Sequence, residues 1–189
     1  MVSLNTPVCN FGWKAKPFNL VGVDNKSWTL NKAKGENGLL IMFICNHCPY
    51  VKAILPRLIQ DLSELKKYGI NSIAISSNDV VNYPQDSFEE MKKLSVLHNF
   101  TFPYIFDESQ SIAKSYHAIC TPDFFGFNSK LELQYRGRFD STGRDDKPPK
   151  DNQKDLYEAM KLISSTQKGP ETQFSSIGCS LKWKEVNQN

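Results

Sequence analysis

The chain lacks any hydrophobic run long enough to cross a lipid bilayer. Its longest apolar stretch, residues 39–45, is far shorter than the roughly 18–20 residues that a membrane-spanning helix needs. Residues 1–20 also lack the apolar segment behind positive charges that marks a secretory signal peptide. We therefore expect no membrane partner and a cytoplasmic location.

The chain also lacks a clustered excess of basic charge. Its 23 Lys and Arg residues stand against 20 Asp and Glu residues, and they are scattered apart from short groups such as Arg136-Gly137-Arg138. Because nucleic-acid binding needs a basic face, we expect no nucleic-acid partner. The composition, with 40% hydrophobic and 23% charged residues, is typical of a folded domain with a substantial core.

The cysteine count argues against a disulfide scaffold. Without a sign of secretion, paired cysteines more often serve redox or metal chemistry. Two of them lie two residues apart in the stretch F-I-C-N-H-C-P-Y-V (43–51), which makes this stretch the first candidate for a site. Cys9 lies in a segment without obvious structure and is expected to have no role. The five cysteines, an odd number, are Cys9, Cys45, Cys48, Cys120 and Cys179.

Strand and helix patterns alternate along the chain. Continuous apolar runs over 38–44 and 70–76 are typical of strands buried on both faces. Between them, apolar residues recur at three- and four-residue steps, which predicts a helix that is kinked at Pro56 and ends near Gly69. This alternation favours an α/β fold. The other predicted elements are a hairpin and loop over 17–37, helices over 84–99, 109–117 and 153–164, a strand over 102–106, a hairpin over 122–139 with its turn at Asn128-Ser129, and an exposed loop over 141–153.

The whole chain, 1–189, is predicted to form a single domain. Its core spans about residues 17–165, and residues 166–189 form a linker and a tail. Because the sequence I-G-C-S-L-K-W (177–183) is apolar again, we expect this tail to dock on the domain that precedes it.

The predicted geometry around Cys45 and Cys48 favours redox chemistry. Cys45 follows a buried strand and is expected at the N-terminus of the next helix, where unpaired backbone amides and the helix dipole favour a thiolate. Its pKa should therefore fall below the free value of about 8.5. His47, when protonated, adds positive charge beside the same sulfur. We therefore predict that Cys45 is the nucleophile, that Cys48 resolves the mixed disulfide, and that His47 tunes the thiolate.

Two alternatives to redox chemistry stay open at this point. The first is a zinc or iron–sulfur binding module that uses Cys45 and Cys48, with or without Cys120. His117 and Cys120 form an H-x-x-C pair that could complete a four-ligand zinc site. The second alternative is a redox-inert interaction domain.

The order of these patterns resembles the thioredoxin fold. More closely, the chain resembles the thioredoxin-like members of the alkyl hydroperoxide reductase C/thiol-specific antioxidant (AhpC/TSA, peroxiredoxin-like) family, over residues 17–184. The resemblance implies a central mixed sheet flanked by helices, with an N-terminal β-hairpin extension and a C-terminal tail. The stretches that carry it are F-I-C-N-H-C-P-Y-V (43–51), S-S-N-D (76–79), F-P-Y-I-F-D-E (102–108), C-T-P-D-F-F (120–125), Y-R-G-R (135–138) and S-I-G-C-S-L-K-W-K (176–184).

The resemblance also implies an activity and a substrate-binding position. A cis peptide bond at Thr121-Pro122 should face the cysteines, with the backbone before Pro122 receiving a substrate peptide. The implied activity is thiol–disulfide exchange on a protein substrate, with electrons from a partner thiol reductant and no cofactor or metal. Thioredoxins carry a buried acid six residues before the first cysteine, and this chain has Leu39 there.

Within the same family, the alternative activity is that of a thiol peroxidase in which Cys48 attacks peroxide. Aligning Cys48-Pro49 with the peroxiredoxin motif Pro-x-x-x-Thr-x-x-Cys places Cys45 at the threonine position and Ile41 at the proline position. Arg136 and Arg138 are the candidates for the peroxiredoxin arginine, although surface charge is the expected role of both. The auxiliary thiols Cys120 and Cys179 are predicted to resolve an intermediate, to pair with each other, or to pack. The sequence does not fix the oligomeric state.

Overall fold

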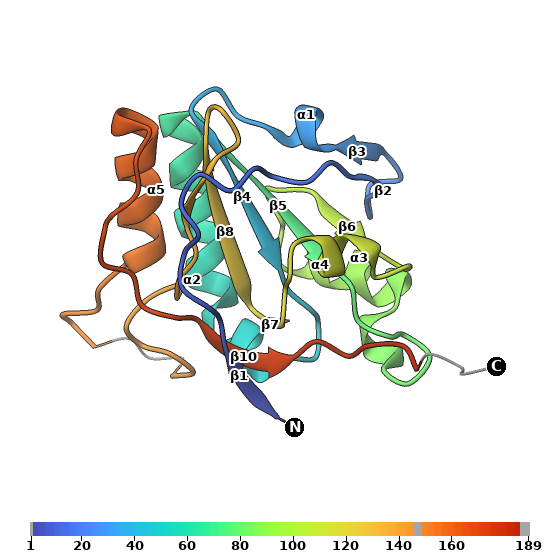
Figure 1. Ribbon diagram of the computed structural model, residues 1–189. Helices are drawn as coiled ribbons and strands as arrows, with labels where there is room; N and C mark the ends of the chain where they lie inside the picture. Colours follow the sequence, from blue (N-terminus) through green and yellow to red (C-terminus); the bar gives the residue numbers. More distant parts are fainter. Residues whose placement is uncertain (1, 146–148, 186–189) are drawn as a thin grey trace.

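The apolar runs form the central strands of a five-stranded sheet (Figure 1). In the computed structural model, which describes residues 2–145 and 149–185, the strand order is β6-β5-β4-β8-β9. Strands β6, β5 and β4 run parallel to one another, β8 runs antiparallel to β4, and β9 runs antiparallel to β8. This arrangement confirms the predicted mixed sheet. The strands are β4 (Gly38–Phe43), β5 (Ile70–Ser76), β6 (Tyr104–Phe106), β8 (Asp123–Asn128) and β9 (Leu133–Tyr135).

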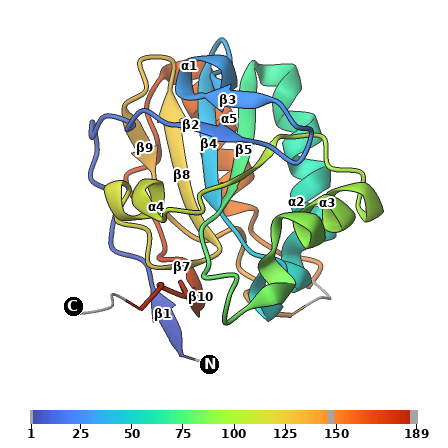
Figure 2. The same cartoon turned by 90° about the vertical axis from the view of Figure 1, so that its right-hand side faces the viewer.

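Helices cover both faces of this sheet (Figure 2). Leu40 and Met42 of β4 pack with one set of helices, which are α2 and α5 together with α3. Leu39 and Ile41, which point to the opposite face, pack with α1 and α4. Both faces of β4 are therefore apolar, as its continuous hydrophobic run predicts. The helices are α1 (Leu30–Ala33), α2 (Pro49–Leu65), α3 (Phe88–Leu97), α4 (Ser111–Ser115) and α5 (Asp155–Thr166), with 3-10 turns η1 (Lys66–Tyr68) and η2 (Pro84–Asp86).

Two smaller sheets complete the fold. The predicted N-terminal hairpin consists of β2 (Asn19–Val21) and β3 (Ser27–Thr29). Segments far apart in the sequence form a second, antiparallel sheet in the order β1-β10-β7, at the lower end of the molecule in Figure 1. Its strands are β1 (Ser3–Asn5), β7 (Cys120–Thr121) and β10 (Ile177–Ser180). The C-terminal segment is therefore built into the domain as a strand.

All of the predicted helices have somewhat different bounds in the structure, and the differences are informative for two of them. The helix after the cysteines ends at Leu65, and a 3-10 turn continues to Gly69, whose φ of +72° suits glycine. The helix predicted over 84–99 divides at Ser87, because the Ser87 side chain accepts a hydrogen bond from the Glu90 amide and starts α3 there. Part of the predicted loop 141–153 lies outside the described residues. Across 2–145 and 149–185, no helix is both long enough and apolar enough to cross a membrane.

Candidate active site

The two cysteines lie in the connection between β4 and α2. Cys45 and Cys48 are 1% and 0% exposed, so both sulfurs are shielded from solvent. Helix α2 begins at Pro49, and Cys48 is its N-cap, with extended backbone angles. The prediction that Cys45 starts the helix was therefore wrong. A proline disfavours helical angles in the residue before it and suits the first helical position, so Pro49 fixes the helix start one residue after Cys48.

Thr121 contacts both sulfurs from β7. The Thr121 hydroxyl lies 3.3 Å from the Cys45 Sγ, and the Thr121 carbonyl oxygen lies 3.0 Å from the Cys48 Sγ. The peptide bond between Thr121 and Pro122 is cis, as the resemblance implies. The structure thus brings the cysteines and the Thr121-Pro122 segment together at one end of the sheet.

A third sulfur reaches the same site from the C-terminal strand. Strand β10 pairs antiparallel with β7 so that Cys179 lies opposite Thr121. The Cys179 Sγ is 3.1 Å from the Cys48 Sγ, and both residues are buried. Cys120 is also buried, but its thiol donates to the Pro122 carbonyl oxygen at 3.6 Å. Of the two predicted auxiliary thiols, Cys179 is therefore the one that contacts the cysteine pair.

A buried carboxylate, Asp86, organises the turn between the cysteines. One of its oxygens accepts hydrogen bonds from the backbone amides of Asn46, at 2.8 Å, and His47, at 3.2 Å. The other oxygen lies 2.6 Å from the His47 Nδ1 and accepts a hydrogen bond from the side-chain amide Nδ2 of Asn78 at 2.8 Å. Asp86 therefore holds His47 in place, with its Nδ1 3.9 Å from the Cys45 Sγ.

Sequence reasoning did not find Asp86. It comes from η2, forty residues after Asn46, and no motif or periodicity connects the two segments. The sequence offered one indirect signal. Leu39 occupies the position of the buried thioredoxin acid, so an acid that serves the cysteines has to come from elsewhere in the chain. In the structure Leu39 is fully buried on the α1 and α4 side of the sheet, and the acid beside the cysteines comes from another loop.

The surroundings of Cys48 favour a thiolate. Its pKa is lowered from 9.0 to about 5, first by the hydrogen bond from the Cys45 thiol, against the opposing effect of burial. Further hydrogen bonds from Thr121, Cys179 and the backbone amide of Val51 in the first turn of α2 lower the pKa further. Together these interactions outweigh burial, so the pKa of Cys48 lies well below that of a free thiol.

The surroundings of Cys45 have the opposite effect. Its hydrogen bond to Cys48 is the largest cause of a raised pKa, followed by burial and by the negative charge of Asp86. The prediction of a low pKa at Cys45 was therefore wrong. The reason is that the hydrogen bond between the two sulfurs raises the pKa of Cys45 and lowers that of Cys48, and that Cys45 is buried beside the Asp86 carboxylate.

The surroundings of the remaining cysteines favour the neutral thiol. Burial, and then the hydrogen bond to Cys48, raise the pKa of Cys179 to about 12. Burial raises the pKa of Cys120 as well, with the charge of Asp123 adding to the effect. Burial also raises the pKa of Cys9 to about 11, close to Gln173 and Arg136. The structure therefore contains one cysteine that is predisposed to act as a nucleophile.

Within residues 2–145 and 149–185, one group of side chains has the spacing of a metal site. Ligand atoms of Cys45, His47 and Asp86 lie within 4.8 Å of one another. Both Asp86 oxygens already accept hydrogen bonds from N–H groups, and the raised pKa of Cys45 disfavours the thiolate that a metal would bind. Cys120 is not part of this group, and His117 is exposed. The arrangement fits a hydrogen-bonded network better than a metal site.

The two candidate arginines form ion pairs with carboxylates. Arg136 forms a 2.9 Å ion pair with the buried Asp123 and is itself only 7% exposed, so the expectation of a surface charge was wrong for this residue. Arg138 forms a 2.8 Å ion pair with Asp155. Both guanidinium groups are thus paired with carboxylates, and the buried Asp123 in particular needs such a partner.

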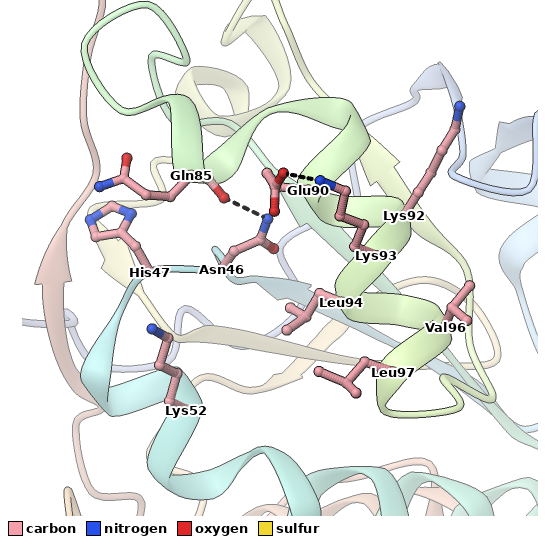
Figure 3. Close-up of a pocket in the computed structure, with 10 residues that line it drawn as sticks. All are labelled: Asn46, His47, Lys52, Gln85, Glu90, Lys92, Lys93, Leu94, Val96 and Leu97. Atoms are coloured by element: carbon pink, nitrogen blue, oxygen red, sulfur yellow. Dashed lines mark hydrogen bonds and ion pairs between the residues drawn. The ribbon is translucent and has the colours of Figure 1, made fainter.

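A groove of about 770 Å³ opens beside the turn between the cysteines. Figure 3 shows the His47 imidazole and the Asn46 amide at one end of the groove, and α3 side chains along the other. The groove therefore connects the His47 side of the site to the protein surface. Its remaining lining residues are Lys52, Gln85, Glu90, Lys92, Lys93, Leu94, Val96 and Leu97.

Comparisons with known proteins identify the family. Residues 11–139 match the model of the AhpC/TSA family. An uncharacterized conserved protein from Geobacillus kaustophilus has 37% sequence identity and a TM-score of 0.92, with 98% of each chain covered. A hypothetical protein from Sinorhizobium meliloti 1021 has 32% identity and a TM-score of 0.86, covering 96% of this chain and 98% of that chain. No curated protein matches the chain.

A more distant comparison concerns the fold alone. The thioredoxin domain of a thiol-disulfide oxidoreductase from Bacteroides vulgatus has 17% identity and a TM-score of 0.57, covering 67% of this chain and 86% of that chain. Its likeness supports the same central sheet and helix arrangement.

Proposed function

The chain belongs to the AhpC/TSA family and has the thioredoxin fold, and on that premise we propose that it is a thiol–disulfide oxidoreductase in which Cys48 attacks and Cys45 resolves. The observation that carries this proposal is the environment of Cys48, which caps α2 and has a pKa lowered to about 5. A thiolate is the nucleophilic form of cysteine, so the attacking role moves from Cys45 to Cys48.

The first step is attack on a substrate disulfide. The Cys48 thiolate forms a bond to one substrate sulfur, and the other substrate sulfur leaves as a thiolate. Cys45 then attacks the Cys48 Sγ, which releases the first substrate sulfur and leaves a Cys45–Cys48 disulfide. A partner thiol reductant returns two electrons to this disulfide. The substrate is thereby reduced and the partner is oxidised.

The second step requires Cys45 to lose its proton. When Cys48 is in a mixed disulfide, its charge no longer raises the pKa of Cys45, so deprotonation becomes easier. His47 and Asp86 are the nearest titratable groups, since the His47 Nδ1 lies 3.9 Å from the sulfur and 2.6 Å from the carboxylate. We assign the path of the Cys45 proton to this pair, with His47 as the group adjacent to the sulfur.

One observation favours thiol peroxidase activity as a second candidate function. Both sulfurs are almost completely buried, which admits a small peroxide more readily than a disulfide of a folded protein. In this reaction the Cys48 thiolate attacks the O–O bond, water or an alcohol leaves, and a sulfenic acid forms. Cys45 condenses with the sulfenic acid to give the same disulfide, with loss of water. Against this candidate, both Arg136 and Arg138 are paired with carboxylates.

The test compares single cysteine variants on two substrates. Cys48→Ser is expected to abolish the rate of oxidised glutathione reduction by dithiothreitol that exceeds the uncatalysed rate, and Cys45→Ser to lower it. Cys9→Ser is the matched control and should retain the wild-type rate, because Cys9 lies outside the site. A wild-type rate in Cys48→Ser would refute the proposal. Hydrogen peroxide consumption that depends on Cys48 and exceeds disulfide reduction would establish the second candidate.

A further inference from the structure

Strand β10 covers the edge of β7 that lies next to the cysteine pair. It pairs antiparallel with β7, with Cys179 opposite Thr121 and Ser180 opposite Cys120. The approach is close at Gly178, where an added Cβ would lie 2.2 Å from the Thr121 carbonyl oxygen. The chain therefore places its own extended segment where the resemblance to thioredoxins implies that a substrate peptide binds. This is the mode in which extended peptides add a strand to a sheet edge.

The side chain that β10 presents to the site is a cysteine. The Cys179 Sγ lies 3.1 Å from the Cys48 Sγ, and Cys179 is 2% exposed. Cys120, on the neighbouring strand, offers a contrast, because its thiol is hydrogen-bonded to the Pro122 carbonyl oxygen. Of these two auxiliary thiols, the one on β10 is therefore the one that contacts Cys48.

The segment after β10 is anchored to two other loops. The Lys182 carbonyl oxygen accepts hydrogen bonds from the Asp79 amide and from the Gln110 side chain, both at 2.8 Å. The Lys182 amide donates to the Asn78 side chain at 2.9 Å. These bonds fix the position of Cys179 over Cys48, so the contact between the sulfurs is part of the folded domain.

We propose that β10 acts as an internal substrate strand, and that Cys179 forms a transient disulfide with Cys48 during the catalytic cycle. This proposal rests on the proposed function, because it needs Cys48 as the sulfur that first reacts with the substrate. It adds a third thiol to the cycle and explains why the docking edge is filled by the chain itself.

The step balances without any further oxidant. Once Cys48 is in a mixed disulfide with a substrate sulfur, the Cys179 sulfur attacks the Cys48 Sγ, and the substrate sulfur leaves with the Cys179 proton. Cys45 then attacks the Cys48 Sγ, which gives the Cys45–Cys48 disulfide and returns Cys179 to a thiol. Burial is the largest cause of the raised pKa of Cys179, and formation of the mixed disulfide removes the further effect of the Cys48 charge, which makes deprotonation of Cys179 easier at this stage.

The experiment uses the full chain with Cys45 removed, so that Cys179 is the remaining partner for Cys48. Cys45→Ser is treated with oxidised glutathione, quenched with acid, alkylated, and analysed by peptide mass spectrometry. We expect a Cys48–Cys179 linked peptide and little glutathione on Cys48. In Cys45→Ser/Cys179→Ser, glutathione should accumulate on Cys48. Cys45→Ser/Cys120→Ser is the matched control and should form the linked peptide as Cys45→Ser does.

The outcomes separate this inference from the proposed function. Glutathione that persists on Cys48 in Cys45→Ser, at the level seen in Cys45→Ser/Cys179→Ser, would overturn the inference and leave the function standing. Absence of any modification at Cys48 in all variants would overturn both. The result in Cys45→Ser needs no substitution at Cys179, so it stands even when the double variant folds poorly.

Discussion

At the scale of single residues, the site is defined by the difference between two cysteines in one short turn. Cys48 caps a helix and receives hydrogen bonds from other side chains, while Cys45 lies beside the carboxylate of Asp86. Proximity in sequence therefore does not give the two sulfurs similar acidity. The hydrogen bond between the two sulfurs is the largest cause of this difference, and burial and the charge of Asp86 raise the pKa of Cys45 further.

The first prediction concerns the ionisation of Cys48. We expect the thiolate ultraviolet absorbance of the reduced protein to decrease as the pH falls through about 5, because this is the pKa of Cys48. Cys48→Ser should lose this transition. Cys45→Ser should shift it to higher pH, because the Cys45 thiol is the largest cause of the lowered pKa. A transition near pH 5 that persists in Cys48→Ser would assign the thiolate to another cysteine.

The same pKa shift has a consequence for stability. Because the pKa of Cys48 in the folded protein lies below its ordinary value of 9.0, ionisation of Cys48 stabilises the folded state. This contribution is complete above pH 9.0 and is lost as the pH falls through about 5. The free energy of unfolding of Cys48→Ser should lack this component, and its difference from the wild type should shrink towards low pH.

At the scale of secondary structure elements, the sequence identifies the strands and helices better than it identifies their contacts. The strands over 38–44 and 70–76 are predictable because each is a continuous apolar run, and both are present at Gly38–Phe43 and Ile70–Ser76. The division of the segment over 84–99 is not apparent from its apolar pattern, because it depends on the side-chain cap at Ser87. This division places Asp86 in η2, where it can reach the cysteine turn.

The candidate site could be predicted only in part for the same reason. The cysteine turn and Thr121-Pro122 are marked by local motifs, and the structure brings them together. Asp86 and the pairing of Cys179 with Thr121 depend on contacts between distant segments, which no local pattern encodes. The acidity of the two sulfurs was not predictable for the same reason, because it depends on contacts with Thr121, Cys179 and Asp86 from distant segments.

The second prediction tests the contact between β10 and β7. Gly178→Ala should push the strands apart, because the added Cβ would meet the Thr121 carbonyl oxygen. We expect alkylation of Cys48 by a maleimide to become about tenfold faster, which corresponds to about 1.4 kcal/mol less free energy for local opening. The rate is measured by mass spectrometry of the Cys48 peptide.

A neighbouring substitution serves as the control for Gly178→Ala. Ser175→Ala changes an exposed side chain just before β10 and should leave the alkylation rate of Cys48 unchanged. Equal rates in Gly178→Ala, Ser175→Ala and the wild type would show that β10 does not limit access to Cys48.

At the scale of the whole molecule, segments from near both ends of the described chain meet over the site. Strand β1 pairs with β10 on the edge opposite β7, with Ser3 facing Cys179, and the Ser180 amide donates to the Val2 carbonyl oxygen at 2.9 Å. The five-stranded sheet contains none of these strands, as the two separate sheets in Figure 1 illustrate. The β1-β10-β7 sheet, which forms a cover over the cysteines, is therefore an addition to the central sheet, and its stability can differ from that of the core.

The third prediction follows from this separation. Deleting residues 2–5 removes β1 and leaves β10 paired on one side only, so we expect the Ser180 amide to exchange with deuterium faster. Amides of β4 and β5 should keep their protection, because their hydrogen bonds lie within the central sheet. Ser3→Ala is the matched control, since it removes the 3.0 Å contact with the Tyr50 hydroxyl but retains the strand. Faster exchange in β4 and β5 to the same extent would contradict a separable cover, because the deletion would then have destabilised the whole domain.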